Sequence, residues 1–224
     1  SIKSFEQLIN KNIKLIFTVD CGTLSFDAIK YAKEKKVDVI VLDHHQSEIK
    51  LPSAFSVVNP NRIDDKSNLQ YLCAAGVAFM FLVSLNRELR SLDWFKKNNI
   101  KEPNLINYLD LVSLGTICDV VPLNGVNHKL AQQGLSALLR SKREVLVKLL
   151  KASSLQNQSL DETDIGFRLG PRINAVGRLE HAHQVISAFI EESPDELIKN
   201  MNRLNEKRKK IQEEILVEAR KKAK

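Results

Sequence analysis

Long hydrophobic runs are missing from this chain of 224 residues. A helix that spans a bilayer needs about 20 consecutive apolar residues, and the longest mostly apolar stretch, residues 74–85, is much shorter. The sequence therefore predicts no membrane segment, and we expect residues 74–85 to form a buried helix. The first residues also lack the pattern of a secretory signal peptide.

Paired cysteines are missing as well. The three cysteines, Cys21, Cys73 and Cys118, form no regular spacing and are odd in number, which argues against a disulfide framework and for a reducing compartment. We therefore expect a cytoplasmic protein in which the cysteines serve as small apolar packing residues. A hydrophobic content of 43% is enough for a full core, with room for one domain plus an appendage.

Two apolar stretches end abruptly in polar side chains. Residues 13–19 and 39–42 read as buried strands, and residues 24–36 between them have helical spacing. A strand–helix–strand unit of about thirty residues has the length of a right-handed parallel crossover. Because ligands of open α/β sheets bind beyond the carboxyl ends of the strands, one edge should collect the polar residues that follow them. These residues are Asp20, Asp43, His44 and His45.

A third acid, Asp119, stands alone in the apolar run of residues 111–123 and needs a partner. Carboxylates and imidazoles without a thiolate suit Mn²⁺, Mg²⁺ or Fe better than structural zinc. Structural explanations stay open for each residue. Asp20 could cap the following helix, Asp43 could be a turn residue, and Asp119 could be a buried hydrogen-bonding anchor.

The remaining elements indicate an α/β protein that becomes helical toward its end. A third strand is expected at residues 55–58, and a polar break at residues 153–159 marks a subdomain boundary. We expect loops at 61–70 and 91–103, and helices at 74–90, 105–117, 128–140, 144–151 and from Ser193 to the end. The predicted domains are residues 1–152, 153–192 and 193–224.

Four ordered motifs carry a family resemblance. Residues 18–23, 43–45 and 113–123 resemble the DHH phosphoesterase superfamily, and residues 165–179 resemble the signature of its RecJ branch of single-strand-specific exonucleases. The resemblance covers nearly the whole chain. It implies a parallel-sheet DHH phosphoesterase domain, here incomplete, followed by a helical region and a long connecting helix.

The resemblance also implies an activity. RecJ-like proteins are phosphodiesterases that use two ions, Mn²⁺ or Mg²⁺, to remove nucleotides from the 5′ end of single-stranded DNA in repair and recombination. By resemblance, Asp20 bridges the two metals, while His44 and Asp119 are further ligands. His45 would contact the scissile phosphate and Asp43 would orient the histidines. Two ions about 3.5–4 Å apart can make hydroxide from water and stabilise the leaving oxygen.

Arginines near residue 170 supply a second candidate site. Arg168, Arg172 and Arg178 surround glycines, and we expect a loop that lets guanidinium groups and main-chain amides approach a phosphate. Alternatively, these arginines are only exposed, solvated residues of the loop and bind no phosphate. By resemblance, Arg172, Asn174 and Arg178 contact the terminal phosphate or the DNA backbone. A net charge of +7 is compatible with such a partner, although one Trp and three Tyr offer no extensive stacking surface.

One expected motif is missing. RecJ proteins carry an Asp-rich motif on an earlier strand, and nothing before Ile13 resembles it. We therefore expect a piece of a longer protein that is inactive alone, with single-stranded DNA and a single-strand-binding or other repair protein as partners. Two alternatives stay open: a phosphodiesterase of short oligonucleotides or cyclic dinucleotides, and a non-catalytic DHH scaffold bound to DNA.

Overall fold

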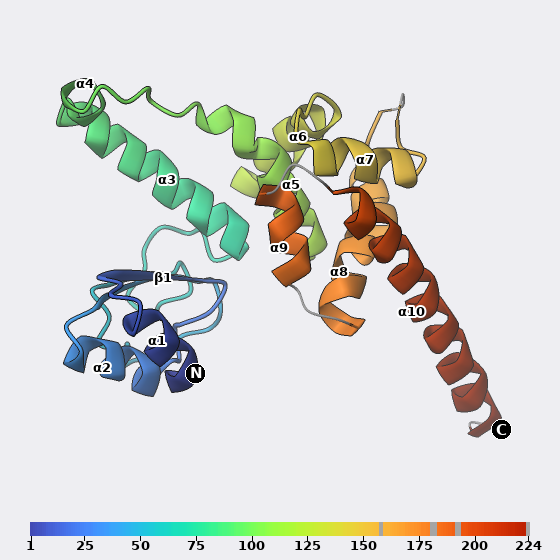
Figure 1. Cartoon of the computed structure of the whole chain (residues 1–224), viewed down its shortest axis with the longest axis horizontal. Coiled ribbons are helices and arrows are strands. Elements are labelled where there is room, and N and C mark those ends of the chain that lie inside the picture. Colours follow the sequence, from blue (N-terminus) through green and yellow to red (C-terminus); the bar gives the residue numbers. More distant parts are fainter. Residues whose placement is uncertain (157–158, 180–182, 191–193, 223–224) are drawn as a thin grey trace. The chain divides into compact units, whose positions relative to one another are not determined.

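The computed structural model describes the chain except for residues 157–158, 180–182, 191–193 and 223–224 (Figure 1). It consists of two compact units, Ser1–Gln132 and Gln133–Lys224. The boundary predicted after residue 152 falls inside the second unit, and the division of the chain into functional domains at residues 152 and 192 stays a prediction.

The first unit contains the expected parallel sheet. Strands β1 (Leu15–Val19), β2 (Asp38–Leu42) and β3 (Ser56–Val58) pair in the order β1-β2-β3, and both pairings are parallel. Helix α2 (Phe26–Glu34) connects β1 to β2, and α1 (Ile2–Ile9) precedes β1. The prediction of an α/β protein with a strand–helix–strand unit is confirmed.

One face of this sheet forms the core of the first unit. The register aligns Ile16 with Val39 and pairs Val41 with Val57, so β-branched side chains gather on that face. They pack against α1 and α2. The cluster consists of Phe5, Ile16, Ala28, Ile29, Ala32, Val37, Val39, Val41 and Val57. On the opposite face, the ring of Phe17 meets Phe81 of α3 (Ala74–Ser91) edge-on, with centroids 5.9 Å apart.

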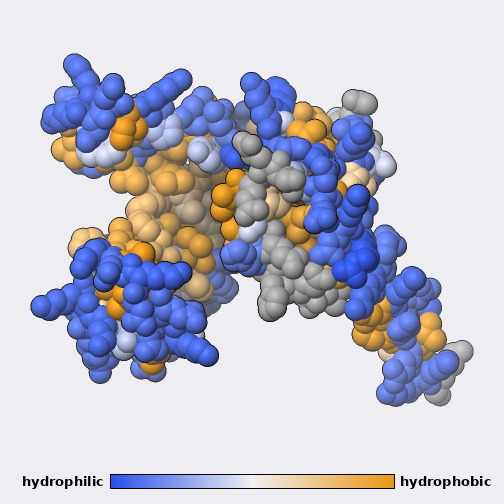
Figure 2. Space-filling view, viewed as in Figure 1, coloured by the Kyte–Doolittle hydropathy of each residue, from blue (hydrophilic) through white to orange (hydrophobic). Residues whose placement is uncertain are grey.

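The expectation that residues 74–85 form a buried helix is wrong. They belong to α3, but of its residues only Gly76, Val77 and Asn86 are buried. Met80, Leu82, Val83 and Leu85 are 37–41% exposed, and Figure 2 shows hydrophobic surface along this helix. Because α3 is apolar on most sides and packs mainly against α5 (Leu109–Cys118), part of its apolar surface is left in solvent. No helix in the described part of the chain is long and apolar enough to cross a membrane.

The segment after α3 is more helical than expected. The predicted loop 91–103 contains α4 (Trp94–Lys97), which follows Asp93 in the left-handed conformation at φ 55°. The predicted helix 105–117 is a 3₁₀ turn, η1 (Leu105–Tyr108), followed by α5. Helix α6 (Gly125–Leu139) begins three residues before the predicted start at His128.

The second unit is helical, and the loop expected around Gly170 is absent from it. Residues Asp164–Leu169 form a π-helical turn, η2, which leads directly into α8 (Gly170–Leu179). Gly170 has a right-handed helical φ of −53°. The wide turn precedes Pro171, whose ring and missing N–H interrupt regular α-helical hydrogen bonding. Glycine and proline were therefore misleading signs of a loop.

The second unit also contains α7 (Glu144–Ala152), α9 (His183–Ile190) and α10 (Asp195–Lys222). The start predicted for α10, Ser193, lies outside the described residues. Along α10, Ile198, Met201, Leu204 and Asn205 are buried, whereas Ile211 and Ile215 farther along the helix are exposed. The apolar side chains of α10 are thus covered only in the first part of the helix.

Candidate metal centre at the sheet edge

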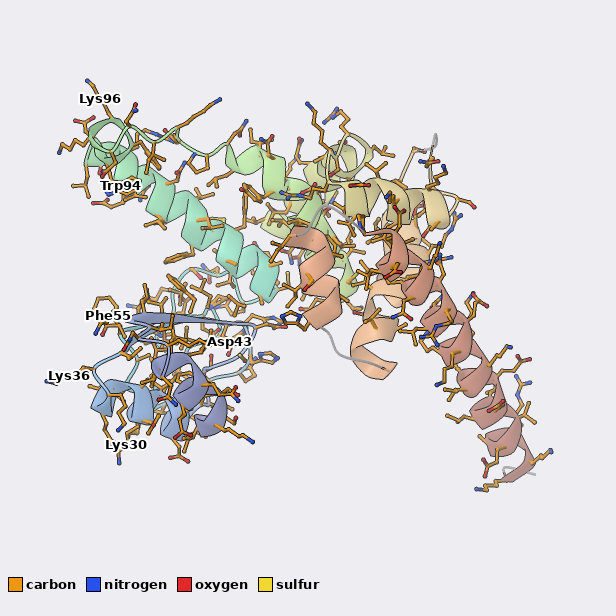
Figure 3. All side chains as sticks on the ribbon, viewed as in Figure 1. Lys30, Lys36, Asp43, Phe55, Trp94 and Lys96 are labelled. Carbon is orange, nitrogen blue, oxygen red and sulfur yellow. The ribbon has the colours of Figure 1, made fainter. Side chains whose placement is uncertain are left out.

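The carboxyl edge of the sheet holds the first candidate residues in place. The Asp20 N–H donates to the carbonyl of Leu42 at 3.0 Å, and the Asp43 N–H donates to the carbonyl of Val58 at 3.1 Å. These bonds continue the strand pairing by one residue beyond β1 and β2. Asp20 and Asp43 therefore lie side by side at the carboxyl edge of the sheet, as predicted from the sequence (Figure 3 labels Asp43).

Three side chains converge on the imidazole of His44. Its Nε2 lies 3.2 Å from Asp20 Oδ1 and 3.6 Å from Asp119 Oδ2. His45 also approaches, since ligand atoms of Asp20, His44 and His45 all lie within 4.8 Å of one another. Adjacent ligands of an octahedral ion with bonds of about 2.1 Å are about 3 Å apart. The spacing of Asp20, His44 and Asp119 therefore fits neighbouring ligands of one cation.

Asp119 reaches this site from the end of α5. It caps that helix, and Val120 after it turns the chain with a φ of 58°. Burial raises the pKa of Asp119, His44 lowers it, and the charge of Asp20 raises it further. Two carboxylates that share one imidazole would be stabilised by a divalent cation between them.

The turn after Asp20 depends on one glycine. Asp20 is in the left-handed region at φ 59°, which Asp tolerates better than most residues. Gly22 follows at φ 120°, and a Cβ at this position would lie 2.4 Å from Thr18 Oγ1. Only glycine fits here without a shift of the strand end.

Asp43 is a buried carboxylate that holds both histidines. Its Oδ1 accepts hydrogen bonds from the His44 N–H at 2.8 Å, the His45 N–H at 3.3 Å and His45 Nδ1 at 2.7 Å. Its Oδ2 accepts one from the Thr23 N–H at 3.0 Å. Burial by itself would raise the pKa of Asp43, but the hydrogen bonds from Thr23, His45 and His44 outweigh it and hold the pKa far below its usual value.

His45 presents one ring nitrogen away from Asp43. Because the ionised carboxylate can only accept, His45 Nδ1 carries the proton of their shared bond. This bond raises the pKa of His45, with burial acting in the opposite direction. The imidazole is 59% exposed, so its Nε2 is available to a phosphate oxygen or a metal ion.

Two cysteines adjoin the candidate ligands. Cys21, next to Asp20, is exposed, which contradicts its expected packing role, and Cys118, next to Asp119, is partly buried. Burial raises the pKa of both thiols, to about 11 for Cys118. The charges of Asp43 and Asp20 add to the effect on Cys21, and that of Asp119 adds to the effect on Cys118. Neither cysteine is therefore a thiolate at neutral pH.

The candidate DNA-binding residues lie on α8, in the second unit. Arg172 Nε donates to Asn202 Oδ1 at 3.0 Å, and its Nη1 donates to the carbonyl of Arg168. Burial lowers the pKa of Arg172. Asn174 is exposed, and the side chain of Arg178 lies outside the described residues. The Arg172 guanidinium thus ties α8 to α10, and its contact with DNA stays a prediction.

Sequence reasoning missed two residues of the sheet edge. Thr23 and Asn59 are both buried and are hydrogen-bonded to each other at 2.8 Å. Asn59 directly follows β3, as Asp20 follows β1 and Asp43 follows β2. The same signal, a polar residue at the end of a strand, could have identified it.

Replacing Asp43 by Asn tests the role of its charge. We expect Asp43→Asn to lower the free energy of unfolding by about 2–4 kcal/mol at neutral pH, because charge-assisted hydrogen bonds at a buried site are lost. The lowered pKa means that the ionised form stabilises the fold above the unfolded pKa of about 3.9, and that this contribution is lost as the pH falls through and below that value. The difference between variant and wild type should therefore shrink between about pH 5 and 2.

Urea denaturation at several pH values measures this difference. Asp27→Asn, at an exposed position in the first turn of α2, is the control and should cost no more than about 0.5 kcal/mol. A pH-independent cost for Asp43→Asn would show that the carboxylate charge is not what stabilises the edge.

Comparisons with known proteins place this geometry in a family. The single-stranded-DNA-specific exonuclease RecJ of Salmonella typhimurium is 38% identical over 218 residues, which are 96% of this chain and 38% of that protein. RecJ of Bacillus subtilis is 33% identical over 97% of this chain and 26% of its own length. The chain therefore spans well under half of the curated relatives it matches.

Solved structures agree with these relatives. The crystal structure of RecJ from Thermus thermophilus in complex with Mn²⁺ superposes with a TM-score of 0.79 and 29% identity, over 97% of this chain and 31% of that one. An exonuclease RecJ bound to manganese gives a TM-score of 0.80 and 28% identity, over 97% of this chain and 53% of that one. The family described as DHH family, N-terminal domain, matches residues 2–116, just over half of the 224 residues. The chain belongs to the DHH family.

Proposed function

We propose that this chain carries the metal centre of a RecJ-like exonuclease, which hydrolyses phosphodiester bonds of single-stranded DNA from the 5′ end in DNA repair and recombination. The proposal rests on one observation: Nε2 of His44 lies between the carboxylates of Asp20 and Asp119. The relatives named as single-stranded-DNA-specific exonucleases supply the substrate. In this proposal the protein works in the cytoplasm, where a single-strand-binding protein is a further partner.

The donor set fits Mn²⁺ or Mg²⁺. Asp20, His44 and Asp119 would hold the ion, since carboxylate oxygens and a neutral imidazole suit these cations. Asp20 is the most exposed of the three side chains, and a carboxylate in that position has a second oxygen for a second ion. When bound, two ions supply an activated water and neutralise charge on the phosphate.

In this proposal His45 contacts the substrate, and Asp43 lies behind it. Asp43 accepts from Nδ1 of His45, which leaves Nε2 to donate to a phosphate oxygen when the ring is protonated. The bond between Nδ1 and Asp43 also fixes the orientation of the ring, so that Nε2 faces away from this carboxylate. Asp43 is buried and acts through His45, so it is a positioning residue in this mechanism.

Phosphate contacts on the second unit would supply affinity. Arg172, Asn174 and Arg178 follow one another along α8, and contacts to the phosphate backbone hold a strand regardless of its base sequence. An exonuclease that works through arbitrary sequences needs binding of this kind. Arg172 already bonds to Asn202 and Arg168, so its substitution alters packing as well as charge, and Asn174 is the cleaner probe.

Metal binding is the most direct test of the centre. We expect the 224-residue chain to bind Mn²⁺, measured from the electron paramagnetic resonance signal of free Mn²⁺, and Asp20→Ala to weaken binding at least about tenfold because a direct ligand is lost. Asp27→Ala, which removes an exposed acid from α2, should bind like wild type. Equal affinity in all three proteins would remove Asp20 from the centre.

The nuclease proposal is tested with 5′-phosphorylated single-stranded DNA and Mn²⁺. In the longer natural protein we expect nucleotide release that Asp20→Ala abolishes, while the 224-residue chain alone stays inactive because it supplies too few ligands for two ions. Activity of this chain that Asp20→Ala abolishes would show that the ligands present suffice. Faster cleavage of dinucleotides or cyclic dinucleotides than of long strands would reassign the substrate. DNA binding without any cleavage by the natural protein would indicate a scaffold.

The phosphate contact is tested with Asn174→Asp. A carboxylate near the DNA backbone should weaken binding of a single-stranded 30-mer about five- to tenfold, by a similar factor for two unrelated sequences, because it repels phosphates. The loss should fall as salt rises. Fluorescence anisotropy measures binding, and Gln156→Asp, at another exposed amide of the same unit, controls for net charge. An equal loss in both variants would show general electrostatics instead of a contact.

A further inference from the structure

Asn59 joins the three strand-end loops at the carboxyl edge. It is 3% exposed and directly follows β3. Its amide nitrogen donates to Thr23 Oγ1, in the loop after β1, at 2.8 Å and to the main-chain carbonyl of His45, in the loop after β2, at 2.8 Å. Its Oδ1 accepts from the Asn61 N–H at 2.8 Å.

The orientation of this amide is fixed by its partners. The carbonyl of His45 can only accept a hydrogen bond, so the amide nitrogen must face it. The Asn61 N–H can only donate, so Oδ1 must face the opposite way. Both amide hydrogens are then used, one on His45 and one on Thr23.

Thr23 links Asn59 to Asp43. Its hydroxyl oxygen accepts from Asn59. Its main-chain N–H donates to Asp43 Oδ2 at 3.0 Å. Asp43 in turn accepts from Nδ1 of His45.

The bonds form a closed ring. It runs from the imidazole of His45 to Asp43, then through the main-chain N–H and the hydroxyl of Thr23 to Asn59, and back to the main-chain carbonyl of His45. Asp43, Thr23 and Asn59 are buried, at 1–3% exposure, so water does not readily replace a lost member. The imidazole itself is more than half exposed, so this ring, and not packing, holds it.

We propose that Asn59 is a positioning residue for His45. By donating to the His45 carbonyl it holds the main chain of His45, and by donating to Thr23 it supports the Asp43 carboxylate that keeps the His45 ring in the Nδ1–H tautomer. The role in catalysis rests on the proposed function, in which His45 meets the phosphate. The ring of hydrogen bonds does not depend on that function.

The tautomer of His45 is measurable in the 224-residue chain itself. In a long-range ¹H–¹⁵N correlation spectrum, recorded at one pH where the ring is neutral, wild type should show a single Nδ1–H form. Asn59→Asp places an oxygen where the donor was, so the His45 carbonyl loses its donor and the Thr23 hydroxyl has to donate where it accepted before. We expect mixed tautomers in Asn59→Asp and in Asn59→Ala.

Thr23 variants probe the next link of the ring. Thr23→Val removes the hydroxyl and should give the same mixture of tautomers, whereas Thr23→Ser keeps the hydroxyl and should restore the wild-type spectrum. If the Asn59 variants fail to fold, this pair decides the question alone. Asn86→Ala, which removes another buried amide and its 2.8 Å bond to Glu102, should lose stability without any change at His45.

A wild-type tautomer in Asn59→Ala or in Thr23→Val would overturn the proposal. Kinetics of the longer natural protein give a second readout: Asn59→Ala should lower kcat about ten- to hundredfold with little change in KM, as partners behind a functional side chain do. An unchanged kcat would also count against it. Because the spectrum needs no cleavage, absence of nuclease activity would refute the proposed function and leave the assignment of Asn59 intact.

Discussion

The buried carboxylate of Asp43 is the interaction on which this sheet edge depends. A charge removed from water is costly unless hydrogen bonds replace its hydration, and here N–H groups of Thr23, His44 and His45 supply them. These donors come from the loops after two different strands. The requirement to satisfy one charge therefore determines the path of both loops, and with it the positions of the histidines.

The parallel sheet brings the loops after β1 and β2 to the same edge. A crossover through α2 sets β1 beside β2, and the pairing of Leu15 with Asp38 continues in register as far as Val19 and Leu42. Both strands consequently end at the same level, and Asp20 and Asp43 extend from there. Helix α5 belongs to a different part of the first unit, yet its end brings Asp119 within 3.6 Å of His44. A rigid edge and the end of one helix together produce the cluster.

The sequence predicted the part of the site that local rules control. Asp20, Asp43, His44 and His45 follow recognisable strands, so the common edge of parallel strands was enough to group them. The approach of Asp119 to His44 was beyond local rules, because it depends on how α5 packs. Sequence alone also misjudged α3, since hydropathy does not reveal which faces of a helix find neighbours. Around Gly170, glycine and proline indicated a loop, but both residues lie at the start of α8, directly after a π-helical turn.

The two cysteines beside the candidate ligands show how such a centre can protect itself chemically. Oxidants and soft metal ions attack the thiolate, and the thiolate fraction of a cysteine falls as its pKa rises. Burial raises the pKa of Cys21 and Cys118, and the neighbouring charges, Asp43 and Asp20 for Cys21 and Asp119 for Cys118, raise it further. A cysteine that stays a thiol in this way, such as Cys118, forms sulfenic acid slowly even though it stands next to a candidate ligand.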